Sequence, residues 1–450
     1  MHSLLSASAL RTVAPLFYSA QINAAALSPL ATAPAFVGAS SSSFSSRSAS
    51  CLGNNIIPAM VASLESAHSN RLGNSSYSSS FSTRLMAAAE NNIASDRKRP
   101  RPSGPPLVDV DCNLLHPDLL SSVVNSSAVL PSQIEEEKEE GMAMIDNALK
   151  ILHHPSTIQS NIVAMISPSS TIDESERSLQ LLQSATEQQR NGICVKTTVG
   201  VHPYHALDVG APQEESLGRL RALLDGHNSR QHICCIGEMG LDYSEGFPEK
   251  QYQLSWFKAQ LDMALEYSLP VFLHERCAFH DTLQCIDDAE AKGHSEGKPM
   301  PKIIVHCFTG SFDECAEYMK RGYYISVSGY INKAGEGADE VKRCLREGII
   351  PMDKLMIETD APYMGFKQCR ESFFEIEGES FTSLPSKKRK NLLKSLYPNV
   401  PSSLPMVLAV ACEELNTGRR ERNETDLSLD ELAKITTENA ALFFDLDGVV

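Results

Sequence analysis

The sequence lacks a long hydrophobic run. None of its apolar stretches approaches the roughly 20 consecutive residues that a membrane-spanning helix needs, so we expect no membrane association. It also lacks a Cys-x-x-Cys pair, and several of its 12 cysteines lie inside apolar runs, where a free thiol packs as a small hydrophobic group. Scattered cysteines of this kind indicate a reducing compartment and argue against a disulfide scaffold or a zinc ribbon.

Positive charge is in short supply as well. The 40 basic residues are outnumbered by 56 acidic ones, which gives a formal net charge of −16. A protein with this charge does not hold nucleic acid by bulk electrostatic attraction. Any nucleic-acid substrate therefore has to be held by local basic groups and by metal ions.

Acidic residues are scarce only near the N-terminus. Residues 1–105 are rich in Ser and Ala and contain a single acid, Glu65, before Glu90. Four arginines, namely Arg11, Arg47, Arg71 and Arg84, also precede Glu90. This composition is typical of an organellar transit peptide followed by a linker, so we predict a disordered extension and a mitochondrial or plastid location. An untargeted extension or a misassigned gene start is the alternative, with the protein then in the cytoplasm or nucleus.

Apolar runs and amphipathic segments alternate from Leu107 onward. The runs predict strands near 107–112, 162–167, 193–201, 233–238, 270–274, 302–306, 323–327 and 354–358. The segments between them predict helices at 135–152, 173–190, 213–226, 249–268, 278–291, 311–321 and 336–347, followed by a long loop at 364–400 and two final helices at 402–416 and 428–443. Eight strands joined by crossover helices form a parallel sheet, and at this number we expect closure into a barrel. The sequence therefore predicts an α/β fold, a (β/α)8 TIM barrel, over residues 106–450.

Four of the predicted strands stop at a carboxylate or an imidazole. The residues at these ends are Glu238, His274, His306 and Asp360. Because the carboxyl ends of parallel barrel strands open on one face, we expect the four side chains to meet there. Together they suffice to hold one or two divalent cations, and Mg²⁺, Mn²⁺ and Zn²⁺ all accept such a mixture. Each residue also has a structural explanation, as a hydrogen-bonded histidine, a turn carboxylate or a loop cap.

A metal centre of this kind predicts hydrolytic chemistry. Two cations about 4 Å apart would activate a water and stabilise the attacking and leaving oxygens of a phosphodiester. Glu238 can bridge two cations through its two oxygens. Asp360 is placed to bind a cation and to accept the proton of the water, so we predict Glu238 and Asp360 as the catalytic residues.

Four blocks of the sequence resemble the signatures of a known family. The blocks are Gly200-Val201-His202-Pro203-Tyr204, Ile236-Gly237-Glu238-Met239-Gly240-Leu241-Asp242-Tyr243, His306-Cys307-Phe308-Thr309-Gly310 and Ile357-Glu358-Thr359-Asp360-Ala361-Pro362-Tyr363. Together with His274, they resemble, in family order, the TatD family of metal-dependent deoxyribonucleases, and the resemblance covers residues 107–444. It implies a TIM barrel of the amidohydrolase type, a divalent metal and hydrolysis of DNA phosphodiester bonds, often from the 3′ end.

The resemblance also implies roles for individual residues. It places four residues at the metal-ligand positions of the family, namely Glu238, His274, His306 and Asp360. His202 and Asp242 match motif residues beside the site, and we assign them to substrate binding.

The first strand departs from the pattern of many family members. They begin with Asp-x-His-x-His, whereas this chain has Asp109-Val110-Asp111-Cys112-Asn113. One branch of the family lacks those histidines and carries Asn at the last position, and this chain resembles that branch. Asp111 and Asn113 would offer oxygen ligands, which favours Mg²⁺ or Mn²⁺ over Zn²⁺. A strand-end hydrogen bond is the alternative role for Asp111, so the site is expected to take one or two ions.

The segment after the eighth strand departs as well. Where the family has Arg-Asn-Glu-Pro, this chain has Tyr397-Pro398-Asn399-Val400-Pro401. Nearby Lys387, Lys388 and Arg389 are candidates for neutralising substrate phosphates. A solvated loop or a localisation patch is the alternative for this basic run.

The leading hypothesis is a metal-dependent deoxyribonuclease, with DNA as substrate, RNA as a second candidate and 3′–5′ exonuclease action. Two alternatives belong to other classes. One is a small-molecule amide or ester hydrolase, because one metal barrel can host many chemistries. The other is a binding protein that has lost catalysis through its changed first strand. The sequence identifies no protein partner.

Overall fold

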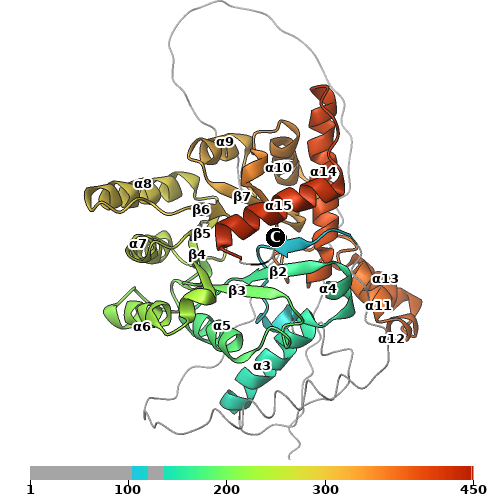
Figure 1. Cartoon of the computed structure of the whole chain (residues 1–450), viewed down its shortest axis with the longest axis horizontal. Coiled ribbons are helices and arrows are strands. Elements are labelled where there is room, and N and C mark those ends of the chain that lie inside the picture. Colours follow the sequence, from blue (N-terminus) through green and yellow to red (C-terminus); the bar gives the residue numbers. More distant parts are fainter. Residues whose placement is uncertain (1–103, 120–135, 447, 449–450) are drawn as a thin grey trace, which may run out of the picture. The chain divides into compact units, whose positions relative to one another are not determined.

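The computed structural model describes residues 104–119, 136–446 and 448. In this part of the chain, eight strands form one sheet in the order β1 to β8, and each strand runs parallel to its neighbours (Figure 1). The strands are β1 (Leu107–Asp109), β2 (Ile162–Ser167), β3 (Cys194–Val199), β4 (Ile233–Asp242), β5 (Val271–Arg276), β6 (Ile303–Val305), β7 (Tyr324–Val327) and β8 (Leu355–Ile357). The predicted (β/α)8 barrel is confirmed. The predicted transit peptide and disordered extension lie outside the described residues, apart from positions 104 and 105.

The first and last strands meet just beyond their regular ends. The N–H of Asp360 donates to the carbonyl of Asp111 at 2.9 Å, and the N–H of Asn113 donates to the carbonyl of Ala361 at 2.8 Å. An isolated parallel bridge joins Cys112 and Ala361. These contacts nearly close the barrel, and they do so within the segments that carry candidate site residues.

Helices connect the strands, as the alternating pattern predicts. The connecting helices are α3 (Glu136–Leu152), α4 (Pro155–Gln159), α5 (Ile172–Ser184), α6 (Glu214–Asp225), α7 (Lys250–Tyr267), α8 (Phe279–Ser295), α9 (Phe312–Lys320) and α10 (Glu336–Arg346), and the chain ends with α14 (Leu404–Glu421) and α15 (Leu429–Phe444). Short 3-10 turns are η1 (Pro203–His205), η2 (Ser229–Gln231), η3 (Gly329–Asn332), η4 (Met352–Lys354) and η5 (Pro401–Ser403). Helix α15 begins with a capping box, in which Ser428 and Glu431 each satisfy a backbone N–H of the other.

The segment 364–400 is not the plain loop that the sequence predicts. It contains the short helices α11 (Glu371–Ile376), α12 (Glu379–Thr382) and α13 (Ser386–Lys394). Helices this short show little periodicity of their own and depend on tertiary contacts. The basic run lies inside α13, so the solvated loop that was an alternative for these residues is not observed.

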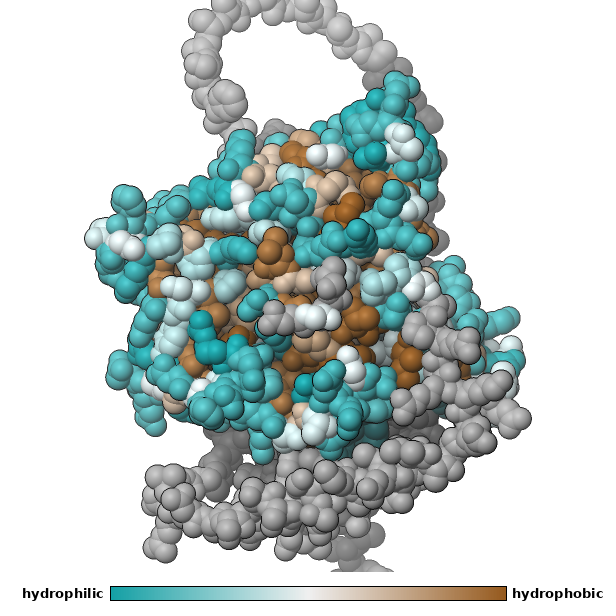
Figure 2. All heavy atoms as spheres, in the orientation of Figure 1, coloured by the Kyte–Doolittle hydropathy of each residue, from teal (hydrophilic) through white to brown (hydrophobic). Residues whose placement is uncertain are grey.

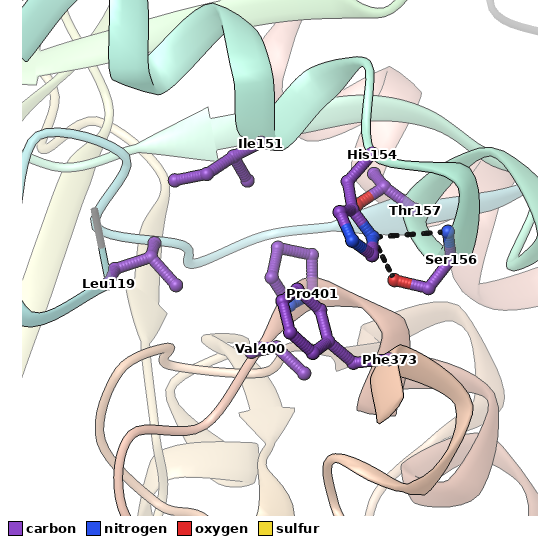
Figure 3. Close-up of a pocket in the computed structure, with 8 residues that line it drawn as sticks. All are labelled: Leu119, Ile151, His154, Ser156, Thr157, Phe373, Val400 and Pro401. Atoms are coloured by element: carbon purple, nitrogen blue, oxygen red, sulfur yellow. Dashed lines mark hydrogen bonds between the residues drawn. The ribbon is translucent and has the colours of Figure 1, made fainter. Parts of the chain in front are cut away.

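A small apolar cavity lies where α4 contacts the segment 364–400 (Figure 3). His154 caps the start of α4, where its ring accepts the N–H of Ser156, and its ring stacks on Phe373 of α11 with centroids 4.2 Å apart. His154 also lies 3.4 Å from Glu377, just past the end of α11. Val400, which precedes η5, lines the same cavity.

The interior of the barrel is packed by its own set of side chains. Strand residues such as Val108, Phe272 and Met356 form a buried cluster with Phe443 and Phe444 of α15. Helix α15 (red in Figure 1) therefore fills the end of the barrel where the strands begin. This arrangement leaves the opposite end, at the carboxyl ends of the strands, for the candidate site.

Hydrophilic and hydrophobic residues are also separated on the surface. Figure 2 shows one face, on which hydrophilic side chains cover the outer helices and hydrophobic ones gather around the barrel between them. No helix among the described residues combines the length and the apolarity that crossing a membrane would require.

Candidate metal centre

The candidate site is built on Glu238, which lies within β4. Its Oε1 atom is 3.2 Å from Nε2 of His202, 3.2 Å from Nδ1 of His274 and 2.8 Å from Nε2 of His306. His274 belongs to β5, His306 directly follows β6, and His202 directly precedes η1. Burial alone would raise the pKa of Glu238, but the charges of His202 and His306 outweigh it and hold the pKa well below its ordinary value. Glu238 is therefore a carboxylate surrounded by imidazoles.

Two groups of metal-ligating atoms share this carboxylate. One consists of His202, Glu238 and His274, and the other of Asp111, Glu238 and His306, and in each group the donor atoms lie within 4.8 Å of one another. The first group offers mainly nitrogen and the second mainly oxygen. Mixed sets of this kind are typical ligands of divalent cations.

Unsatisfied polar atoms in the second group fit a bound cation. His306 is 3% exposed, and its Nδ1 lies 2.9 Å from Oδ2 of Asp111. The distance suits an ion pair, yet this oxygen and both ring nitrogens of His306 lack a hydrogen bond of acceptable direction. Buried polar atoms are rarely left without partners, so these atoms are candidates for binding a shared cation.

Asp242, at the end of β4, contacts the ring nitrogen of His274 that does not face Glu238. Its Oδ2 lies 3.1 Å from Nε2 of His274, while its Oδ1 accepts the N–H of Ser244 at 2.8 Å. Burial would lower the pKa of His274, but the hydrogen bonds and charges of Asp242 and Glu238 outweigh it and raise the pKa to about 9. A carboxylate that orients a histidine ligand in this way is a common feature of metal sites. The structure thus places Asp242 behind a candidate ligand, although the sequence suggested substrate binding.

His202 is also held in one orientation. Its Nδ1 accepts the N–H of Tyr204 at 3.1 Å, which leaves Nε2 facing Glu238. The sequence suggested substrate binding for this residue, and the structure places it among the candidate ligands.

Asp360 lies beside the donor groups and belongs to neither of them. The Oδ1 atom of its side chain lies 3.5 Å from the Nδ2 atom of Asn113. The same amide lies 3.3 Å from Oδ1 of Asp111, so Asn113 links the two carboxylates through its nitrogen. Burial raises the pKa of Asp360 to about 7, against the opposing charge of His306. A carboxylate with that pKa suits proton transfer near neutral pH.

Two buried carboxylates near the site escaped the sequence reasoning. Glu358 is fully buried, with Oε1 at 3.7 Å from Nδ1 of His306 and Oε2 accepting the hydroxyl of Ser326 at 2.6 Å. Asp109 accepts both the N–H and the hydroxyl of Thr359, at 2.8 and 2.7 Å. The signal for Glu358 was its position, because it directly follows β8, just as His306 directly follows β6.

The three predicted phosphate-binding residues lie elsewhere. Lys387, Lys388 and Arg389 are part of α13, and no hydrogen bond or ion pair among the described residues joins them to the donor groups. Arg389 donates to the carbonyl of Thr382 at 2.6 Å instead. Their role in binding phosphate stays a prediction.

The fold and these donor groups define a class of protein: a parallel (β/α)8 barrel with a candidate divalent metal centre at the carboxyl ends of its strands. The chain belongs to the family of TatD-related DNases, whose model matches residues 153–445.

Curated relatives support this assignment. The 3′-5′ ssDNA/RNA exonuclease TatD of Cronobacter sakazakii is 38% identical over 168 residues, or 37% of this chain and 57% of that protein. The protein of the same name from Enterobacter lignolyticus is 33% identical over 202 residues, covering 44% of this chain and 68% of its own length. The match to the Cronobacter protein thus spans little more than half of that relative.

Solved structures share the fold. A hydrolase of the TatD family from Entamoeba histolytica has a TM-score of 0.53 and 22% identity, and covers 76% of this chain and 99% of its own. YJJV, a TatD homolog from Escherichia coli, has a TM-score of 0.51 and 20% identity, and covers 75% and 98%. At these identities the likeness concerns the fold alone.

Proposed function

We propose that the protein is a metal-dependent nuclease that hydrolyses phosphodiester bonds of DNA, removing nucleotides from the 3′ end of single strands. The observation that carries the proposal is the shared carboxylate of Glu238, which unites two groups of metal-ligating atoms. The names of the relatives, 3′-5′ ssDNA/RNA exonucleases, support the substrate class and favour RNA as a second candidate.

The residues of the site have distinct roles in this proposal. Glu238 and His306 would hold a divalent cation with Asp111, and His202 and His274 complete the second position around Glu238. When bound, such a cation lowers the pKa of a water ligand and neutralises phosphate charge. Asp360 accepts the proton of the attacking water.

We propose Mg²⁺ or Mn²⁺ as the ion of the group that contains Asp111, because its donors are mainly carboxylate oxygens. The group with two imidazoles also suits Zn²⁺. Two groups of candidate ligands give room for one or two ions.

The test combines metal removal with one substitution. Protein treated with chelator is supplied with Mg²⁺, Mn²⁺ or Zn²⁺ and incubated with single-stranded DNA or RNA labelled at either end. We expect hydrolysis that depends on the metal and shortens the strand from its 3′ end. Glu238→Gln should abolish it, whereas Glu215→Gln, at an exposed position of α6, should not. Hydrolysis of amide or ester substrates without any cleavage of nucleic acid would refute the proposal.

We also propose that residues 1–105 direct the protein to a mitochondrion or plastid. Support comes from their Ser- and Ala-rich, acid-poor composition. The test is the location of a fluorescent protein fused behind residues 1–105, and a diffuse signal in the cytoplasm or nucleus would contradict the proposal.

A further inference from the structure

Exposed aromatic side chains follow two of the segments that carry candidate site residues. Within residues 104–119, 136–446 and 448, the Phe, Tyr and Trp side chains that reach exposure are Tyr204, Tyr363 and Tyr397, at 37%, 39% and 40%. Tyr204 lies two residues after His202, and Tyr363 lies three residues after Asp360. Large aromatic groups are usually buried, so their concentration beside the donor groups singles out this face of the barrel.

Tyr363 and Tyr397 lie next to each other. Their ring centroids are 6.2 Å apart, and the rings are inclined by 42°. The hydroxyl of Tyr363 lies 2.8 Å from Nε2 of His116, and the hydroxyl of Tyr397 donates to Asp118. Because each hydroxyl is anchored, the rings are held in place before any ligand arrives, which reduces the entropy lost on binding.

Backbone hydrogen bonds tie both tyrosines to the site. The N–H of Tyr363 donates to the carbonyl of Asp360 at 2.7 Å. Two residues after Tyr397, Asn399 donates its N–H to Pro362 at 2.8 Å and its side-chain amide to Thr359 at 2.9 Å. The two rings therefore have a fixed position next to Asp360.

Carboxylates are numerous among the buried side chains of this face, so its own charge favours nucleic acid little. The donor groups and their neighbours are rich in buried carboxylates, which include Asp109, Asp111, Glu238, Glu358 and Asp360. Stacking of bases on aromatic rings supplies sequence-tolerant binding that needs no positive charge. It also requires unpaired bases, because the bases of a duplex are already stacked on each other.

We propose that Tyr363 and Tyr397 form a stacking platform for an unpaired base of a single-stranded nucleic acid, next to the phosphate held at the metal centre. This inference rests on the proposed nuclease function and adds a reason for single-strand selectivity. The platform binds the base, and the donor groups act on the backbone.

The test measures binding separately from hydrolysis. A fluorescent oligothymidylate with hydrolysis-resistant phosphorothioate linkages is titrated with protein in Mg²⁺, alongside the same backbone without bases and a duplex. We expect the wild type to prefer the strand with bases, and Tyr363→Ala and Tyr397→Ala to weaken its binding by about tenfold, as loss of one stacked base implies. Tyr363→Phe, which keeps the aromatic ring, should retain most of the wild-type affinity. Binding of the strand without bases should hardly change in any variant.

A matched control is available in α7. Tyr267 is half-buried, and its hydroxyl donates to Asp225 at 3.1 Å, much as that of Tyr397 does to Asp118. Tyr267→Ala should bind the oligothymidylate like the wild type, and circular dichroism checks that every variant is folded. Equal weakening for strands with and without bases, or full affinity in both alanine variants, would overturn the inference. If the wild type binds the strand but hydrolyses no unmodified DNA, the nuclease proposal fails while the platform stands.

Discussion

A single carboxylate oxygen organises the centre at the scale of individual residues. Three imidazole nitrogens lie 2.8 to 3.2 Å from Oε1 of Glu238. Two of these rings are fixed from behind, His274 by Asp242 and His202 by the N–H of Tyr204. Ligands that are oriented in advance need little rearrangement when a cation binds, and this favours affinity.

Asp242→Asn tests that orientation directly. The substitution keeps the size of the side chain and removes the charge that faces Nε2 of His274. We expect divalent-metal affinity to fall by about 10- to 100-fold, the usual effect of losing such a partner, with the fold retained. Calorimetric titration of the metal-free protein with Mn²⁺ or Zn²⁺ measures the change.

The control for this prediction is Asp262→Asn. Asp262 forms an ion pair with Lys292 at 2.7 Å on the outer helices, and both side chains are about half exposed. The Asp262→Asn substitution should leave the affinity for the metal unchanged. Metal binding by Asp242→Asn at wild-type strength would show that His274 needs no such support.

Sequence reasoning found the residue types of the site better than their arrangement. The strand-end rule located Glu238, His274 and His306, because parallel strands present their carboxyl ends on one face. It could not tell that His202 joins a donor group while Asp360 lies beside one. Asp360 is three residues beyond β8 and adopts a positive φ of 51°, so its direction depends on a turn that no pattern of alternation describes.

At the scale of elements, the strands were the most predictable part. Their apolar runs are continuous because both faces are buried, and the predicted limits differ from the observed ones by a few residues. The main difference is β4, which continues past Glu238 because Gly240 pairs with His274. A Cβ atom on Gly240 would lie 1.8 Å from the carbonyl oxygen of His274, so this close pairing of β4 and β5 requires glycine.

The helices of the segment 364–400 were the least predictable. The contact of His154 with this segment should make the stability of the protein depend on pH. Burial lowers the pKa of His154 from 6.5, against the hydrogen bond and charge of Glu377. The unfolded chain therefore binds a proton at higher pH than the folded one, so the stability that neutral His154 contributes is present above pH 6.5 and is lost as the pH falls through the lowered pKa.

His154→Asn should make stability less sensitive to acid. Asparagine can still cap α4 but cannot take up a proton in this range. We expect the urea midpoint of the wild type to fall more steeply below pH 6.5 than that of the variant. His294→Asn, at an exposed position of α8, serves as the control. The same acid dependence in His154→Asn and the wild type would contradict the prediction.

At the scale of the whole barrel, α15 acts as the closing element. Its Asn439 donates to the carbonyl of Leu355 at 2.8 Å, and its Thr437 donates to that of Pro106 at 3.0 Å. The helix thus contacts the starts of both β8 and β1. Phe444 completes the packing inside, with its ring 6.3 Å from that of Phe272.

Phe444→Ala should destabilise the protein strongly. Phe444 is 1% exposed, and removing a buried aromatic ring costs about 3–5 kcal/mol through lost burial and the cavity left behind. Leu442 of the same helix is 70% exposed, so Leu442→Ala should change the free energy of unfolding by no more than about 0.5 kcal/mol. Urea denaturation followed by circular dichroism measures both. Similar losses in the two variants would show that α15 does not seal the barrel.

The pairing of the chain's first strand with its last segments also constrains how the protein can be made. Asp109 bonds to Thr359, 250 positions further along, and α15 follows later still. A ribosome that has just synthesised β1 has not yet produced the neighbours that this strand needs. Long-range contacts of this kind form slowly, because a large loop must close first. We therefore expect part of the hydrophobic surface of β1 to stay uncovered until synthesis has passed Thr359 and α15.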